Sequence, residues 1–213
     1  MPLIVVLAGV NGAGRSSVAG EAFRAFGNDY FNPDEVSRQI LEATGCTVEE
    51  ANARAWEEGR KRLEEAIRTN ANFALESTLG GNTITALLRR AAQAGFEVMV
   101  IFIGLATPEQ HIERVRARVA AGGHDIPERK IRERWNSSRR NLIALMPFLT
   151  ELRVFDNSAE RSSRGAIPPP KELLHLRGGA VIAPRPELLP ETPEWAKPIV
   201  ACALSLARRR QDV

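Results

Sequence analysis

The stretch AGVNGAGRSSVAG, from Ala8 to Gly20, decides the fold. It follows an unbroken apolar run that begins at Leu3, which is the pattern of a buried parallel strand. Glycines at positions 9, 12 and 14 let successive backbone N–H groups converge on phosphate oxygens at the positive end of the next helix. The run GVNGAGRS meets the pattern G-x-x-x-x-G-K-[ST] everywhere except at the lysine, which is Arg15 here. A purely structural turn is the alternative, and the preceding strand favours phosphate binding.

This loop predicts a site for ATP and Mg²⁺. Ser16 would offer its hydroxyl to a Mg²⁺ ion that bridges the terminal phosphates. Position 15 should supply a cation to the β- and γ-phosphates; arginine keeps the charge, but its broad planar fork does not fit where a slim ammonium reaches in. We therefore expect ATP binding with slowed phosphoryl transfer. The predicted nucleotide-binding residues of the loop are Gly9, Asn11, Gly12, Ala13, Gly14, Arg15, Ser16 and Ser17.

Predicted strands and helices alternate along the first 160 residues. After the first strand, we expect strands within the segments 30–35, 72–78, 96–105 and 151–158, and helices within 16–26, 47–70, 83–95, 107–123 and 126–149. This order predicts an α/β fold of the P-loop NTPase or kinase type, with three layers and a parallel, doubly wound sheet. Ligands of such sheets bind at the carboxyl ends of the strands.

The composition of the chain changes near residue 160. Eight of the thirteen prolines lie between positions 168 and 198, and the run IPPP at 167–170 is typical of an extended linker. We expect a short strand within 178–184 and a closing helix within 193–210. The sequence therefore predicts a kinase core over residues 1–160 and a proline-rich extension over 161–213 that packs on the core.

Asp34 falls just past the second predicted strand and Glu76 at the carboxyl end of the third, so both should share a sheet edge with the glycine loop. Asp34, in FNPDE, can accept the proton of a hydroxyl that attacks the γ-phosphate, which is the role of the base in kinases. An N-cap or turn aspartate is an equal alternative after Asn-Pro. Glu76, in LESTLGG, could order a magnesium-bound water or hold a substrate hydroxyl, and Thr78 shapes the same loop. The alternative for Glu76 is a capping residue for the helix near position 82.

Basic residues are concentrated in one part of the chain. Residues 111–140 carry nine Lys and Arg against four Asp and Glu, whereas the formal net charge of the whole chain is +3. Nucleotide phosphates would explain this clustering, and a solvated helical face is the alternative. The segment AAGGHDIP at 120–127 separates two arginine-rich helical pieces, which predicts a lid over about 114–135 that closes on the transferring phosphoryl group. The expected phosphate contacts are Arg118 and Arg134, with Arg114 and Arg132 as further candidates.

Composition and cysteine content predict a cytoplasmic protein. Apolar residues make up 44% of the chain and charged residues 26%, which is ordinary for a globular protein. Cys46 and Cys202 form neither a disulfide framework nor a metal site, so we expect a reducing compartment. The apolar start lacks preceding basic residues and leads at once into a glycine-rich turn, unlike a signal peptide. No stretch approaches the roughly 18 apolar residues of a membrane span, so no membrane partner is expected.

The ordered motifs resemble the zeta-toxin family of P-loop proteins, in particular its compact bacterial branch of predicted ATPases. The matching pieces are AGVNGAGRSS, FNPDE, ESTL, RVAAGGHDIP, IRERW, NL and FDNS, in the family order over residues 3–158. The resemblance implies a P-loop kinase core related to chloramphenicol phosphotransferase. It implies phosphorylation of a sugar hydroxyl of UDP-N-acetylglucosamine, with Asp34 as the base and with Glu76 and Thr78 on the sugar-nucleotide side. It also implies that Asp156 and Asn157 lie near the nucleotide base, and that an antitoxin protein could be a partner.

Three functions remain open at this point. The first is a toxin-like ATP-dependent kinase that acts on a hydroxyl of a small molecule, such as a sugar nucleotide. The second is a nucleotide-binding protein with weak or no turnover, because Arg15 replaces the lysine. The third, a nucleic-acid-binding module, ranks last because Trp135 is the only aromatic residue on the basic hairpin. The retained Asp34, Glu76 and lid arginines favour the enzyme over the second reading.

Overall fold

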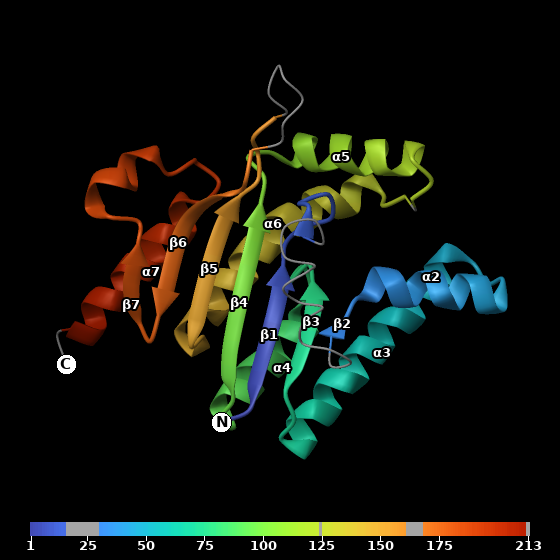
Figure 1. Ribbon diagram of the computed structural model, residues 1–213, viewed down its shortest axis with the longest axis horizontal. Coiled ribbons are helices and arrows are strands. Elements are labelled where there is room, and N and C mark those ends of the chain that lie inside the picture. Colours follow the sequence, from blue (N-terminus) through green and yellow to red (C-terminus); the bar gives the residue numbers. More distant parts are fainter. Residues whose placement is uncertain (16–29, 124, 161–167, 212–213) are drawn as a thin grey trace.

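The computed structural model describes residues 1–15, 30–123, 125–160 and 168–211. Within these residues the strands form a single mixed sheet in the order β2-β3-β1-β4-β5-β6-β7 (Figure 1). The strands are β1 Leu3–Ala8, β2 Tyr30–Phe31, β3 Phe73–Ser77, β4 Glu97–Gly104, β5 Glu151–Asp156, β6 Lys171–Arg177 and β7 Ala180–Ala183. The predicted first helix, Ser16, Ser17 and His124 lie outside the described residues.

The first five strands are parallel, as the alternation of elements predicted. β1 pairs with β3 on one side and with β4 on the other, and β5 continues the parallel sheet beyond β4. β6 and β7 add two antiparallel strands at one edge, so the sheet is mostly parallel. The hairpin between them turns at Gly178 and Gly179, whose φ angles of 56° and 85° suit a tight connection. β6 itself was not expected, because the preceding prolines indicated a linker.

The helices begin and end largely at the predicted signals. They are α2 Pro33–Thr44, α3 Val48–Thr69, α4 Asn82–Gln93, α5 Pro108–Ala120, α6 Glu128–Leu145 and α7 Lys197–Gln211. Thr47 and Glu50 form a reciprocal capping box at the start of α3, and Thr107 caps α5 ahead of Pro108. α2 was not expected: the strand predicted within 30–35 covers only Tyr30 and Phe31, and Asn32 caps a helix that begins at Pro33. Of the helices that the structure describes, none has the length and apolar character to cross a membrane.

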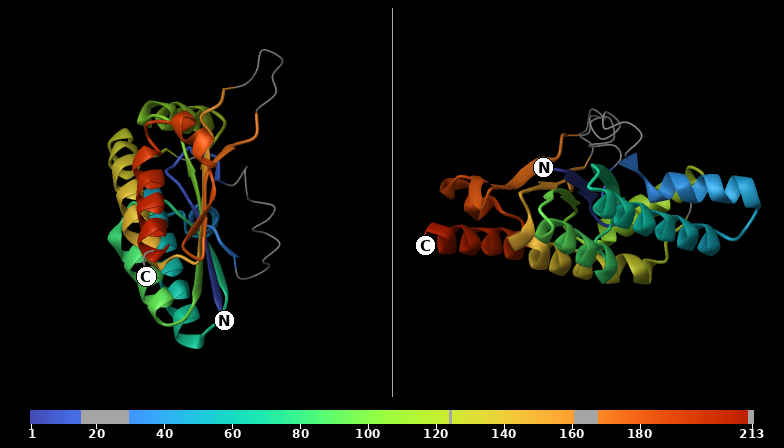
Figure 2. Two further views of the ribbon diagram at one scale, coloured as in Figure 1. Left: turned by 90° about the vertical axis from the view of Figure 1, so that its left-hand side faces the viewer. Right: turned by 90° about the horizontal axis from the view of Figure 1, so that it is seen from below.

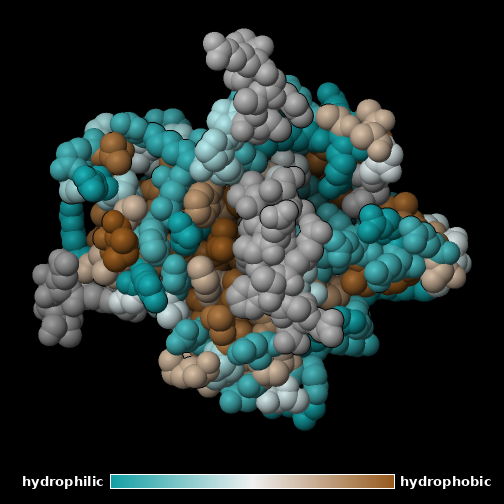
Figure 3. All heavy atoms as spheres, viewed as in Figure 1, coloured by the Kyte–Doolittle hydropathy of each residue, from teal (hydrophilic) through white to brown (hydrophobic). Residues whose placement is uncertain are grey.

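The main core lies between the sheet and the helices on one face. Figure 2 shows α4, α6 and α7 on the same side of the sheet. Ile4, Val6 and Ala8 of β1 point to this side, where they join a large buried cluster. Val5 and Leu7 alternate with them and belong to a smaller cluster on the other face. On that face, apolar residues are visible over the strands left of centre in Figure 3.

The C-terminal segment packs against the carboxyl end of β4. Trp195, just before α7, is buried and its ring lies 6.3 Å from that of Phe102, centroid to centroid, at a tilted angle. A Cβ atom on Gly104 would overlap the indole ring, so this approach requires glycine there. Trp195 therefore joins the end of the chain to the strand edge that bears the candidate site.

Candidate active site

The glycine loop has the backbone geometry that its sequence predicts. Gly9, Gly12 and Gly14 all have positive φ angles, of 147°, 84° and 85°. The loop also packs closely on its surroundings: a Cβ on Gly12 would lie 2.6 Å from the carbonyl oxygen of His111, and one on Gly14 would lie 2.7 Å from Nδ2 of Asn157. Side chains at these positions are excluded by both conformation and space. The loop is thus held in shape from outside as well as by its own turns.

Two side chains from other elements hydrogen-bond the loop backbone. Nδ1 of His111, on α5, lies 2.9 Å from the carbonyl oxygen of Asn11, and Nδ2 of Asn157 donates to the carbonyl of Ala13 at 2.8 Å. His111 is 1% exposed, and burial, with the charges of Arg114 and Arg15, lowers its pKa to about 4 although its bond to Asn11 opposes this. His111 is therefore neutral at physiological pH and donates its Nδ1 proton to the loop.

Asp156 ends β5, and Asn157, which follows it, lies against the loop. Asp156 accepts a hydrogen bond from the backbone of Ser158 at 3.2 Å. Asn157 contacts the loop through its amide, as described above, and its own carbonyl accepts from Nη2 of Arg114 at 2.7 Å. Arg114 thereby supports Asn157 from α5 rather than reaching into the cavity.

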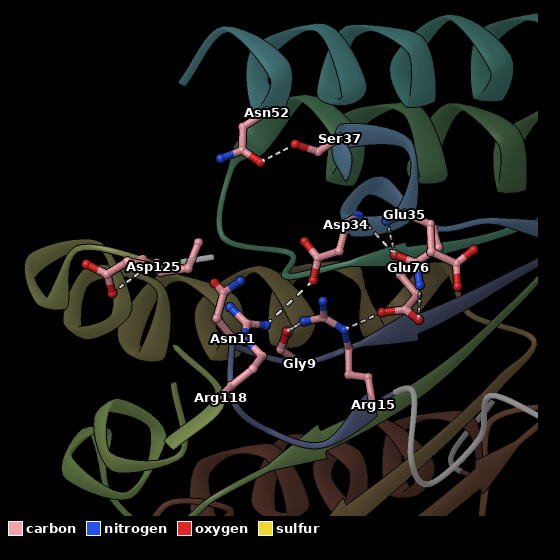
Figure 4. Close-up of polar contacts among 12 residues, drawn as sticks. Gly9, Asn11, Arg15, Asp34, Glu35, Ser37, Asn52, Glu76, Arg118 and Asp125 are labelled. Atoms are coloured by element: carbon pink, nitrogen blue, oxygen red, sulfur yellow. Dashed lines mark hydrogen bonds and ion pairs between the residues drawn. The ribbon is translucent and has the colours of Figure 1, made fainter. Parts of the chain in front are cut away.

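Arg15 lies beneath the loop in a buried ion pair. Its Nε lies 3.0 Å from Oε2 of Glu76, and its Nη1 donates to the carbonyl oxygen of Gly9 (Figure 4). Arg15 is 7% exposed and the side chain of Glu76 only 1%. The charge at the lysine position of the motif is thus compensated by a carboxylate at the end of β3.

Glu76 accepts hydrogen bonds from two further residues near β2. Its Oε1 accepts from the hydroxyl of Tyr30 and, at 3.2 Å, from Nδ2 of Asn32. Burial, together with the bond to the Glu76 carboxylate, raises the pKa of Tyr30 above its usual range. The carboxylate therefore joins β3 to β2, to the cap of α2 and, through Arg15, to the glycine loop.

Asp34 stands in the first turn of α2, at the same sheet edge. Its backbone N–H donates to Oδ1 of the N-cap Asn32 at 2.9 Å, and its carboxylate is 38% exposed. Arg118 of α5 approaches it, with 3.8 Å between Nη1 and Oδ2 (Figure 4). Two charges of opposite sign that the sequence assigned to different motifs thus meet beside the glycine loop.

The predicted lid, about 114–135, takes in the second half of α5 and the first residues of α6. α5 lies across the carboxyl ends of the strands, and α6 runs from there along one face of the sheet (Figure 1). Arg134 of α6 reaches the loop, where its Nη1 donates to Oδ1 of Asn11 at 2.7 Å. Burial and the nearby charge of Arg15 lower its pKa, while Asp34 and Glu133 act in the opposite direction. Arg132 instead pairs with Glu109 at 2.5 Å on the exposed side of the lid, away from the other site residues.

A cavity of about 470 Å³ connects these parts. Its wall includes the loop residues Asn11 and Arg15, the acidic residues Asp34 and Glu76, the β3–α4 loop with Thr78, and Arg134. The far wall comes from α3. The residues of that wall are Val48, Glu49, Asn52, Trp56, Gly59 and Arg60. The cavity thus opens from the glycine loop toward a second, partly apolar side.

Sequence reasoning missed the α3 wall and the partners of Glu76. Trp56 is 48% exposed on an otherwise highly charged helix, and such an isolated aromatic residue was the available signal. Tyr30 and Asn32 flank a motif that the sequence did identify. Nothing local to either residue indicated a bond to position 76.

Comparison with known proteins agrees with this architecture. An AAA domain family (AAA_33) matches residues 4–143. An uncharacterized protein of Haemophilus influenzae is 31% identical over 134 residues, which make up 60% of this chain and 88% of that protein.

Among solved structures, a chain of the AvrRxo1-ORF1:-ORF2 complex with ATP superposes with a TM-score of 0.67 at 16% identity, covering 91% of this chain. This chain spans 64% of the length of that one. A structure of the PezAT chromosomal toxin–antitoxin system of Streptococcus pneumoniae superposes with a TM-score of 0.54 at 13% identity, over 100% of this chain and 86% of the other. The fold is the α/β P-loop NTPase fold, with a mostly parallel sheet flanked by helices, and the chain belongs to the AAA domain family AAA_33.

Proposed function

We propose that this protein is an ATP-dependent phosphotransferase that acts on a hydroxyl group of a small molecule. The observation that carries the proposal is the single cavity that joins the glycine loop to Asp34 and to the lid residue Arg134. A kinase needs a phosphate site, a base and a cation around one reaction volume, because phosphoryl transfer depends on positioning and charge stabilisation.

The nucleotide would bind with its phosphates on the glycine loop. The three glycines have the positive φ angles of a backbone that can present N–H groups to an anion, and the contacts from His111 and Asn157 hold the loop in that conformation. MgATP is the proposed co-substrate, with Ser16 as the residue that would contact the metal ion. The ATP bound in the AvrRxo1-ORF1:-ORF2 complex supports this assignment by analogy of fold.

Asp34 is the proposed general base. Its carboxylate lines the cavity, is accessible to a small molecule and lies at the N-terminus of α2. An acceptor hydroxyl held between Asp34 and the glycine loop could pass its proton to Oδ1 or Oδ2 as the phosphoryl group transfers. Arg118 and Arg134 would then neutralise the charge that develops on the transferring group.

The acceptor would occupy the side of the cavity that faces α3. Trp56 offers an apolar surface, Asn52 and Thr78 offer hydrogen-bonding groups, and Arg60 offers a positive charge. This mixture suits a polar molecule with a planar or sugar-like face. By resemblance to zeta toxins, a sugar nucleotide such as UDP-N-acetylglucosamine is the proposed acceptor, and an antitoxin is the proposed protein partner. The similarity of fold to the PezAT toxin–antitoxin system is consistent with the latter.

A second function is favoured by one observation, the ion pair between Arg15 and Glu76. If the charge at position 15 is not available to the phosphates, the protein could bind a nucleotide without turning it over. The two functions differ in one measurement, transfer of the labelled γ-phosphate of ATP to an acceptor.

The test is a two-step experiment on the purified full chain. MgATP at millimolar concentration should raise the melting temperature, because a ligand that binds only the folded state stabilises it by mass action. A screen of sugar nucleotides and nucleosides should then identify an acceptor that gains the label. Stabilisation without transfer would establish the second function, and the absence of both would refute nucleotide binding altogether. A known P-loop kinase treated in parallel is the control.

A further inference from the structure

The buried pair of Arg15 and Glu76 suggests a role for Arg15 that differs from that of the lysine in the motif. The guanidinium uses two separate donors, Nε toward the Glu76 carboxylate and Nη1 toward the Gly9 carbonyl. Gly9 lies at the start of the glycine loop and Arg15 at its end. Arg15 therefore closes the loop on itself and ties it to the neighbouring strand β3.

The strands beneath this contact are already in register. Leu7 of β1 pairs with Glu76 of β3, and the N–H of Gly9 donates to the carbonyl of Ser77 at 3.2 Å. Arg15 adds a side-chain link above these backbone bonds. A lysine ammonium is a single point donor group and cannot reproduce two donors held apart in one rigid plane.

Turning Arg15 out toward a phosphate would have a large cost. The carboxylate of Glu76 would lose its cation while remaining buried, and breaking a buried ion pair by removing one partner is strongly destabilising. The hydroxyl of Tyr30 and the amide of Asn32 would still bond the carboxylate, but neither carries a positive charge. The pair therefore favours an Arg15 that stays in place when a ligand arrives.

A different arginine is placed to meet the phosphates. Arg134 donates a hydrogen bond to the side chain of Asn11 in the loop, and it lines the same cavity as Arg15. Burial and the positive charge of Arg15 both disfavour the charged form of the Arg134 guanidinium. A phosphate anion in the cavity would stabilise that positive charge. Its lid helix packs closely here, since a Cβ on Gly80 would lie 2.8 Å from the Cγ of Arg134.

We propose that Arg15 is a positioning residue, which acts through Glu76 and the Gly9 carbonyl to hold the shape of the glycine loop. The cation that meets the terminal phosphate is Arg134. This inference rests on the proposed nucleotide site, and it changes the meaning of the motif: the arginine is a structural adaptation paired with an acidic partner, and the lid takes over the role of the lysine.

The decisive measurement is the ratio of the affinities for MgATP and MgADP, obtained by calorimetry on the full chain. ADP lacks only the γ-phosphate, so the ratio reports the contact with that group. Arg134→Gln should lower the ratio at least about tenfold. The double variant R15Q/E76Q, which removes both charges of the buried pair together, should weaken the binding of MgATP and MgADP alike by loosening the loop, so that its ratio falls much less than that of Arg134→Gln. A fall in the ratio of the double variant as large as that of Arg134→Gln, or no fall in Arg134→Gln, overturns the proposal.

Arg132→Gln is the matched control, because Arg132 lies on the same helix but pairs with Glu109 on the exposed side. Its ATP-to-ADP ratio should equal that of the wild type. A fall as large as that of Arg134→Gln would show a general effect of charge on α6 and would overturn the specific role of Arg134.

A second readout separates positioning from a merely structural role. Once an acceptor is known, Arg15→Lys should lower kcat at least about tenfold while the KM for ATP changes less, since a loop displaced by about 1 Å loses in-line geometry. A turnover that rises in Arg15→Lys would show that position 15 faces the phosphate and would overturn the proposal. The lysine variant retains a positive charge beside Glu76, so it is expected to fold.

Failure of the proposed function would be recognisable by itself. A wild-type protein that binds neither nucleotide refutes the nucleotide site. The thermal unfolding of Arg15→Gln, Glu76→Gln and the double variant then decides the remaining claim. The double variant should lose less stability than the two single variants combined, because each single variant leaves one charge unpaired. Additive losses would show that the two residues do not act together.

Discussion

The buried histidine beneath the glycine loop predicts how the stability of the protein depends on pH. His111 has a pKa of about 4 in the folded state and 6.5 in its ordinary state. Between these values the unfolded chain binds a proton that the native protein does not. Stability that is fully present above pH 6.5 is therefore lost as the pH falls toward 4. One pKa unit corresponds to about 1.4 kcal/mol, so the free energy of unfolding falls by about 3 kcal/mol once the pH lies below both pKa values.

The measurement is urea unfolding at several pH values between 7.5 and 4.5, for the wild type and for His111→Asn. Asparagine places an amide near Nδ1 and retains a donor for the Asn11 carbonyl, but it does not titrate. Carboxylates elsewhere titrate in both proteins, and subtracting the two curves removes their effect. The difference between the curves should shrink by about 2.5 kcal/mol between pH 7.5 and pH 4.5. His175→Asn, on β6, is the control: its unfolding free energy should keep the pH dependence that His111 gives to the wild type.

Equal pH slopes for the wild type and His111→Asn below pH 6.5 would refute this reasoning. They would mean that His111 charges in the native state as easily as in the unfolded state. The imidazole would then be exposed to water in solution, and the tight contact between α5 and the loop would not exist there.

Three further changes test the site. Asp34→Asn should lower kcat by about 10² to 10⁴ and spare ATP affinity, whereas Glu35→Gln, one residue on, should retain turnover; equal activity of the Asp34 variant would place the base elsewhere. Gly12→Ala should weaken both stability and ATP binding, because its Cβ meets the His111 carbonyl at 2.6 Å, while Gly45→Ala carries only the strain of a positive φ, about 1–2 kcal/mol. Unfolding midpoints and calorimetry compare the two, and similar losses would contradict the packing argument. Trp56→Ala should raise the KM for the acceptor several-fold without changing that for ATP; an unchanged acceptor KM would remove α3 from the acceptor site.

The parallel part of the fold was predictable because its signals are local. The continuous apolar run of β1, the Thr47 and Glu50 capping box and the Thr107-Pro108 start of α5 each carry their information within a few residues. β6 was not predictable in this way. It pairs with β5 only after the chain has turned back along the edge of the sheet, and Leu174 and Leu176 are buried in the main core cluster that forms only in the folded protein.

The candidate site shows the same limit. The glycine pattern and the order of the strands place Asp34 and Glu76 at the correct sheet edge. The sequence could not show that Arg15 turns inward to Glu76, because the choice between a phosphate and a buried carboxylate depends on side-chain packing across three strands. Nor could the sequence predict that Trp56 lines the cavity, because it lies on a helix whose charge pattern indicated a solvated surface.

The contact between Trp195 and Gly104 has an evolutionary consequence. A side chain at position 104 and the indole ring cannot occupy the same space, so the two positions are expected to change together among descendants of a common ancestor. A lineage that loses the C-terminal segment is released from the glycine and can accept alanine or a larger residue at the end of β4. A lineage that keeps the tryptophan cannot.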